Sequence, residues 1–94
     1  MYCVYILFSE KLNKHYVGST GFIENRLAQH IEYPMKDSFT SKANDWKLMA
    51  KIECQSRDQG MRIEKHIKSM KSRNYIQNLC RYSEMTEKLR TRYQ

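Results

Sequence analysis

The sequence predicts an α+β domain with a small three-stranded antiparallel sheet flanked by helices, in the order β-β-α-β-α-α. Two observations favour this class. Short segments rich in aromatic and β-branched residues are followed by longer segments whose apolar residues recur at helical spacing. The chain also has 94 residues, 40% of them hydrophobic, with three Gly and one Pro, which suits one small domain with a modest core.

The first two predicted elements form a hairpin. Residues 2–8 (YCVYILF) are aromatic and β-branched and predict a buried strand. The polar residues 9–14 suit a turn, and residues 15–18 (HYVG) resume the strand pattern and stop at Gly18. Two short strands joined by a polar connection indicate an antiparallel pair.

A helix is expected next, over residues 21–33. Ser19 or Thr20 can cap it, and Pro34 ends it because proline cannot continue a helix. Its predicted core stripe follows the spacing i, i+4, i+8 and consists of Ile23, Leu27 and Ile31.

Residues 35–45 are polar and predict a loop, and Trp46 to Glu53 alternates well enough for a third strand. Ser56 and Gln59 have the spacing of a capping box, so a second helix should begin there and continue to about Lys71. Its expected inward residues are Ile63, Ile67 and Met70.

A third helix is predicted over residues 73–80, with Tyr75, Ile76 and Leu79 facing inward. Residues 83–92 are polar and suit either a short helix or a frayed tail. The chain is therefore divided into a domain over residues 1–82 and a polar C-terminal helix or tail over residues 83–94.

The charge of the chain is uneven. The formal net charge is +7; residues 1–47 carry 6 basic and 5 acidic residues, and residues 48–94 carry 11 and 5. Such an excess in one half favours a polyanionic partner, most commonly nucleic acid. The alternative is a basic surface that only keeps the protein in solution.

The cysteines and the N-terminus indicate a cytoplasmic protein. Cys3, Cys54 and Cys80 form no CxxC pair and no zinc-site spacing, which suits reduced thiols. The longest apolar run, residues 3–8, is too short to cross a bilayer, and no basic segment precedes it, so we expect neither a membrane span nor a signal peptide.

Several residues of the predicted hairpin lie at positions that suit a catalytic or phosphate-binding role. If the two strands of the hairpin pair, the phenols of Tyr5 and Tyr16 lie near each other on one sheet face. Gly18 and Ser19 are expected where the chain leaves the sheet for a helix N-terminus, which is a natural phosphate site. The alternative for each tyrosine is a half-buried strand residue with its hydroxyl in water.

Three further candidates lie on the predicted helices. Arg26 and His30 are four residues apart and share a helix face. Arg26 lies at the edge of the apolar stripe, and His30 lies within it. Glu64 lies beside the apolar stripe of the next helix, in the basic stretch MRIEKHIK. Taken singly, the arginine suits a surface charge, the histidine a core-edge residue, and the glutamate an ion pair with Lys68, Lys65 or Arg62.

Taken in order, these residues resemble the GIY-YIG endonuclease family, above all its small single-domain bacterial members. Val4-Tyr5-Ile6 stands at the family's first tripeptide and Tyr16-Val17-Gly18 at its second, and nine residues separate the two. Arg26 and His30 match the family's helix arginine and the residue one turn on, and Glu64 matches its metal-binding glutamate. The resemblance covers residues 2 to about 79.

The chain departs from the family pattern at three places. Cys3, and not glycine, precedes Val4, and Ser19 stands where some members have lysine. Many members have an asparagine about a dozen residues after the glutamate, and here Asn74 and Asn78 flank that position.

The resemblance implies metal-dependent hydrolysis of DNA phosphodiester bonds, with a structure- or repair-related role. Tyr5 or Tyr16 would act as the base, helped by His30, and Arg26 would stabilise charge on the phosphoryl oxygens. Glu64 would hold one Mg²⁺ or Mn²⁺. The alternatives are a catalytically idle nucleic-acid-binding module on the same fold and a basic protein-interaction domain.

Overall fold

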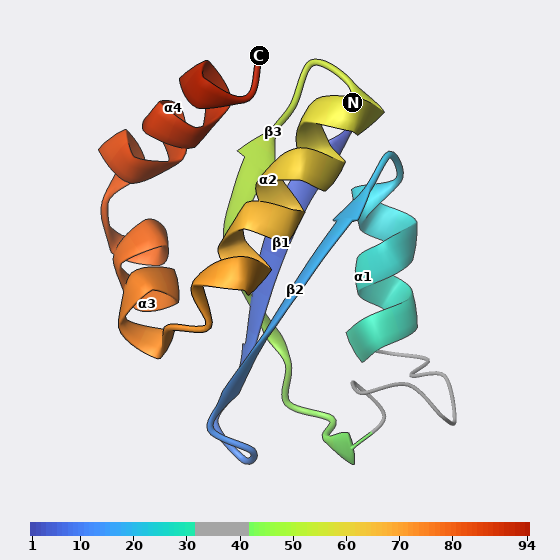
Figure 1. Cartoon of the computed structure of the whole chain (residues 1–94). Helices are drawn as coiled ribbons and strands as arrows, with labels where there is room; N and C mark the ends of the chain where they lie inside the picture. Colours follow the sequence, from blue (N-terminus) through green and yellow to red (C-terminus); the bar gives the residue numbers. More distant parts are fainter. Residues whose placement is uncertain (32–41) are drawn as a thin grey trace.

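The computed structural model describes residues 1–31 and 42–94, apart from the side chains of residues 29–31. The described elements follow the predicted order, with one helix added at the C-terminus (Figure 1). They are β1 (Cys3–Ser9), β2 (Lys14–Thr20), α1 (Ile23–Ile31), β3 (Lys47–Glu53), α2 (Arg57–Met70), α3 (Arg73–Arg81) and α4 (Ser83–Arg92).

The three strands form one antiparallel sheet in the order β2-β1-β3, as predicted. β1 is central and almost entirely buried, which explains its continuous apolar sequence. Its alternate side chains supply two separate cores. Val4 and Ile6 face the cluster formed with α2, α3 and α4, whereas Tyr5 and Leu7 face the cluster that α1 covers.

β2 is longer than the sequence predicts. It begins at Lys14 and continues through Gly18 to Thr20, so the chain does not leave the sheet at Gly18. Gly18 pairs with Tyr5, and Ser19 pairs with Val4. The expected site at a helix N-terminus is therefore misplaced: Gly18 and Ser19 are strand residues, because pairing with β1 holds the backbone extended beyond the glycine.

α1 begins at Ile23, after a turn in which the Thr20 hydroxyl accepts a hydrogen bond from the Phe22 amide at 3.0 Å. Ile23 and Leu27 pack on the cluster around Tyr5, as predicted. The expected end of the helix at Pro34, the side chain of Ile31 and most of the loop over 35–45 lie outside the described residues.

α2 begins at the predicted cap, where the Ser56 hydroxyl accepts from the Gln59 amide at 3.1 Å. The Gln59 side chain accepts from the Gln55 amide rather than from Ser56, so only half of the capping box forms. Ile63 is buried as expected, but Met70 is 44% exposed. Met70 lies in the last turn, beyond the part of α2 that covers the sheet.

α4 is a helix rather than a frayed tail. Leu89 is buried in the main core, and the Tyr93 phenol lies 2.8 Å from Nδ1 of His66 on α2. Gln59 also donates to the carbonyl of Arg90. These contacts hold α4 against α2, which the polar sequence of this segment did not indicate. No helix among the described residues is long and apolar enough to cross a membrane.

Candidate active site

The two tyrosines of the hairpin lie together, as predicted. Tyr5 and Tyr16 belong to the same cluster on the α1 face of the sheet, and their ring centroids are 6.2 Å apart. Their environments differ. Tyr5 is fully buried, whereas Tyr16 is half-buried on the edge strand β2. The Tyr5 phenol is therefore withdrawn from solvent, and the Tyr16 phenol lies nearer the surface.

Gly18 makes room for the Tyr5 ring. A Cβ atom at position 18 would lie 2.5 Å from the Tyr5 hydroxyl, 2.7 Å from its Cζ and 3.2 Å from Cε1 of Tyr16. The φ angle of Gly18 is not positive, so close approach, and not backbone conformation, is what requires glycine here. Sequence reasoning assigned Gly18 a phosphate contact and missed this packing role.

Arg26 reaches the same place from α1. Its side chain is exposed overall, and its guanidinium is close enough to the Tyr5 phenol to lower the pKa of that phenol. Burial raises the pKa of Tyr5 well above its usual value, and the neighbouring Tyr16 raises it further. Arg26 opposes that rise by favouring the phenolate, while Glu64 adds to it. The pKa of Tyr5 thus responds to three other candidate residues: Tyr16, Arg26 and Glu64.

Glu64 lies on α2 with both carboxylate oxygens occupied. The Ser19 hydroxyl donates to Oε1 at 2.5 Å, and the Lys68 ammonium donates to Oε2 at 2.6 Å. Ser19 is also 3.0 Å from the hydroxyl of Tyr2. The ion pair with Lys68 that sequence reasoning gave as an alternative is therefore present, and Ser19 and Tyr2 are partners that it did not identify.

The position of β2 explains how these residues meet. Tyr16 and Gly18 face α1, whereas Ser19 faces α2, because neighbouring strand residues point to opposite faces. β2 is an outer strand, so groups from both faces come together around its free edge. Residues from four elements, β1, β2, α1 and α2, form one site at this edge.

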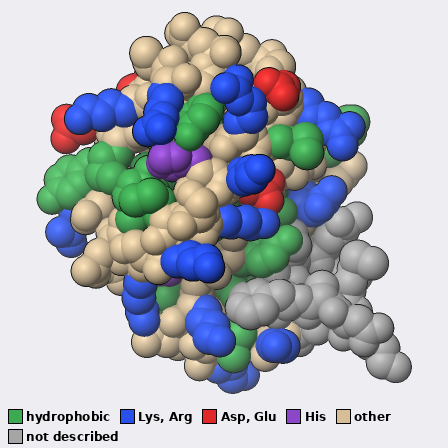
Figure 2. Space-filling view, in the orientation of Figure 1, with side chains coloured by type: hydrophobic (Ala, Val, Ile, Leu, Met, Phe, Trp, Pro, Cys, Tyr) green, Lys and Arg blue, Asp and Glu red, His purple; other side chains and the backbone are tan. Residues whose placement is uncertain are grey.

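The surroundings of Glu64 are basic. It lies in a surface groove of about 560 Å³ that Arg57, Arg62, Lys65 and Lys68 also line. Figure 2 shows many Lys and Arg side chains on this face of the molecule and few acidic ones. A carboxylate among cations can hold a metal ion where a phosphate group also binds.

Two further residues stand at or near positions that the family pattern marks, His30 and Asn78. The side chain of His30 lies outside the described residues, so its role beside the phenols stays a prediction. Asn78 is exposed on α3 and does not line the Glu64 groove.

The residues present fit Mg²⁺ as a metal held by few protein groups. Among the described residues, no group of three or more His, Cys, Asp or Glu side chains could hold a metal ion. A zinc site of the usual kind is therefore not formed by them. Mg²⁺ keeps several waters and commonly uses one or two carboxylates together with substrate phosphates. Glu64, in a groove lined by basic residues, is a carboxylate ligand that suits Mg²⁺ in this way.

Comparison with known proteins agrees with the geometry. The model of the GIY-YIG catalytic domain matches residues 1–77 of this chain. The searches of curated proteins and of solved structures gave no significant match. The matched range contains Tyr5, Tyr16, Arg26 and Glu64 and ends before α4.

Proposed function

The chain belongs to the GIY-YIG nuclease family, and on that basis we propose that it is a Mg²⁺-dependent endonuclease that hydrolyses DNA phosphodiester bonds. The observation that carries the proposal is the convergence of Tyr5, Tyr16, Arg26 and Glu64 at the free edge of β2. Action on branched or repair-related DNA, use of Mn²⁺ and a cytoplasmic location stay predictions.

Tyr16 is the better candidate for the general base. Burial raises the pKa of Tyr5, so its phenol holds its proton more firmly than an ordinary tyrosine. Tyr16 is half-buried on the edge strand, where substrate can approach. We assign Tyr16, in its phenolate form, to accept the proton of the attacking water, with His30 as the predicted acceptor of the phenol's own proton, and Tyr5 to position Arg26.

Arg26 can serve the phenol and the substrate together. A guanidinium carries five N–H donors, so it can act on the Tyr5 phenol and still offer other donors to phosphoryl oxygens. Positive charge held at this point stabilises the negative charge that grows on those oxygens in the transition state. In this role the Tyr5 phenol keeps the arginine in place.

Glu64 is assigned to hold the metal, which when bound would supply positive charge to stabilise the leaving oxygen. The Ser19 hydroxyl fixes Oε1 of Glu64 and so orients the carboxylate. The Lys68 side chain is 55% exposed, which leaves it free to turn from Oε2 toward a substrate phosphate. The backbone of Gly18 and Ser19 as a phosphate contact stays a prediction.

The Glu64–Lys68 pair is the observation that favours the alternative function, an idle nucleic-acid-binding module. Paired this way, the carboxylate needs no metal. The two functions differ in what Glu64→Gln does, since glutamine keeps the shape and the bond from Ser19 but loses the charge.

The test is nicking of supercoiled plasmid and branched DNA in Mg²⁺. We expect cleavage by the wild-type protein, loss of cleavage in Glu64→Gln, and little change in DNA affinity measured in EDTA. The control is Glu84→Gln, which removes an exposed carboxylate on α4 and should cut normally. Full activity of Glu64→Gln would remove the metal-ligand role, and absence of wild-type cleavage with normal DNA binding would favour the idle module.

A further inference from the structure

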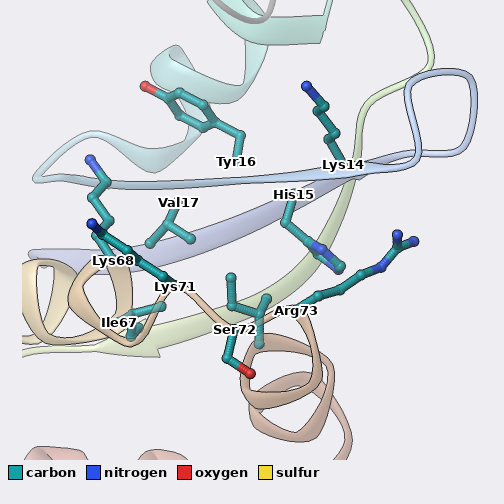
Figure 3. Close-up of a pocket in the computed structure, with 10 residues that line it drawn as sticks. Lys14, His15, Tyr16, Val17, Ile67, Lys68, Lys71, Ser72 and Arg73 are labelled. Carbon is teal, nitrogen blue, oxygen red and sulfur yellow. The ribbon is translucent and has the colours of Figure 1, made fainter.

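A second groove lies beside the candidate active site. It has a volume of about 460 Å³, within the range of roughly 300–1,000 Å³ that is usual for small-ligand sites. Its walls are β2 on one side and, on the other, the end of α2 and the start of α3 (Figure 3). Neither the family's motifs nor the predicted catalytic residues, apart from Tyr16 at its edge, account for this groove.

The floor of the groove is apolar. Val17 from β2 faces Ile67 from α2, and Ile76 from α3 completes the surface. His15 adds a ring beside them, pointing toward the same side of β2 as Val17. Burial, and then the charge of Arg73, lower the pKa of His15, so its ring is neutral at neutral pH. A flat apolar group would find both aliphatic and aromatic surface here.

The rim of the groove is cationic. Lys68, Lys71 and Arg73 line it, whereas the Lys14 side chain points to the other side of β2 (Figure 3). None of the described residues that line the groove is acidic. The Lys71 ammonium makes no hydrogen bond or ion pair with any residue that the structure describes. Arg73 reaches across to the side chain of Asn13 in the β1–β2 turn, which places its guanidinium over the groove. Such a rim is complementary to phosphate.

The groove is continuous with the groove that contains Glu64 through Lys68. Lys68 lines both, and it contacts the Glu64 carboxylate at 2.6 Å. Tyr16 also borders the groove, but its phenol points to the other side of β2, toward α1 (Figure 3). A strand whose phosphodiester lies at Glu64 would therefore have its next nucleotide at this groove.

We propose that this groove binds one unpaired nucleotide of the substrate strand, next to the bond that is cut, with the base on the apolar floor and its phosphates on the cationic rim. The proposal rests on the proposed nuclease function. A base within a duplex has both faces stacked and cannot enter, whereas an unpaired base gains contact with apolar and aromatic surface. The groove thus selects DNA with a single-stranded segment at the cleavage point.

The test compares three DNA ligands by fluorescence anisotropy in EDTA: a blunt duplex, the same duplex with a short single-stranded extension, and that extension with an abasic first position. Extensions of both polarities are used. We call the extension that has a base at its first position the natural extension. We expect it to bind at least about fivefold more tightly than the abasic extension, because stacking of one base contributes about that much affinity in single-strand sites. Equal binding of the natural and abasic extensions would overturn the proposal.

The groove variant is Lys71→Gln with Arg73→Gln, and the control is Arg81→Gln with Lys88→Gln, which removes the same charge from exposed positions on α3 and α4. The groove variant should lose most of the preference for the natural extension over the blunt duplex, and the control should keep it. If both behave alike, the groove is not the site. Should the double variant fail to fold by circular dichroism, Lys71→Gln alone is compared with Lys88→Gln, since Lys71 makes no side-chain contact that holds the fold.

Because these measurements contain no metal, they separate the two proposals. A protein that nicks DNA but shows no preference for the natural extension retains the nuclease function and loses the groove assignment. A protein that prefers the natural extension, loses that preference in the groove variant and cuts nothing keeps the groove and loses the nuclease function.

Discussion

Tyr5 and Tyr16 show how two like residues in one cluster acquire different chemistry. One lies on the central strand with its hydroxyl against Gly18, and the other lies on the outer strand. Burial separates their tasks: a phenol withdrawn from water holds its proton and can orient a neighbour, whereas a half-buried phenol can meet substrate.

This difference predicts unequal effects of removing each hydroxyl. Tyr16→Phe should lower single-turnover cleavage at saturating Mg²⁺ by about 10²–10⁴-fold, the usual contribution of a general base. Tyr5→Phe should lose less, because it keeps the ring and removes only the hydroxyl that positions Arg26. Arg26→Ala serves as the reference and should cost about 10²–10³-fold. Wild-type rates in both phenylalanine variants would exclude either phenol as the base.

Gly18 carries a stability prediction of its own. Gly18→Ala places a methyl group 2.5 Å from the Tyr5 hydroxyl, and overpacking of this kind costs about 1–3 kcal/mol in the free energy of unfolding. Gly21→Ala is the matched control, since its nearest neighbour would be an ordinary 3.6 Å away. Urea unfolding of both variants measures this loss of stability. Equal midpoints would show that the Tyr5 ring moves aside with no loss in the free energy of unfolding.

At the scale of elements, α4 is the segment whose place the sequence least reveals. It lies beyond the range that the family model matches, yet Leu89 is 4% exposed and belongs to the same core as Ile63 and Ile67. The contacts of Tyr93 with His66 and of Arg90 with Gln59 add polar links to α2. α4 therefore supports the helix that carries Glu64.

We therefore expect Leu89→Ala to destabilise the whole domain. Loss of a buried leucine side chain costs about 2–5 kcal/mol, which lowers the thermal midpoint by many degrees in a chain of this size. Lys88→Ala changes an exposed neighbour and should have little effect. Thermal unfolding followed by circular dichroism checks this, and an unchanged midpoint in Leu89→Ala would mean that α4 folds and frays independently of the core.

At the scale of the whole molecule, charge is arranged along one path. The basic residues around Glu64 lie on α2, and those of the second groove lie on α2, at the α2–α3 junction and on α3. Six of the eleven basic residues in residues 48–94 thus line the two grooves, where a strand would cross the candidate active site. This arrangement favours backbone contacts, which carry no base sequence.

Binding to duplex DNA should therefore weaken steeply with salt and show little sequence preference. Each phosphate contact contributes roughly −0.9 to the slope of log affinity against log salt, so three or four contacts give about −3 to −4. Anisotropy titrations over a series of KCl concentrations, with two unrelated duplex sequences, measure both properties. A flat response would show that the charge only maintains solubility.

The element order, the antiparallel hairpin and the family followed from patterns that local sequence carries. The apolar run of β1, the cap at Ser56 and the spacing of Tyr5, Tyr16 and Arg26 depend on neighbours a few residues apart, which determine strand, cap and helix face. The pairing of the tyrosines followed from the hairpin alone. These features needed no knowledge of distant contacts.

Contacts between distant residues were decided only by the tertiary structure. Ser19 donates a hydrogen bond to Glu64, 45 positions away, and Gly18 leaves room for the Tyr5 ring. Both contacts arise because β2 continues past the glycine and α2 packs on the sheet face to which Ser19 points. Whether residues 83–92 fold against the core likewise depended on a hydrophobic surface that α2 and α3 complete. The register of one strand pair and the position of one helix set these contacts, and both result from packing of the whole chain, which no local pattern records.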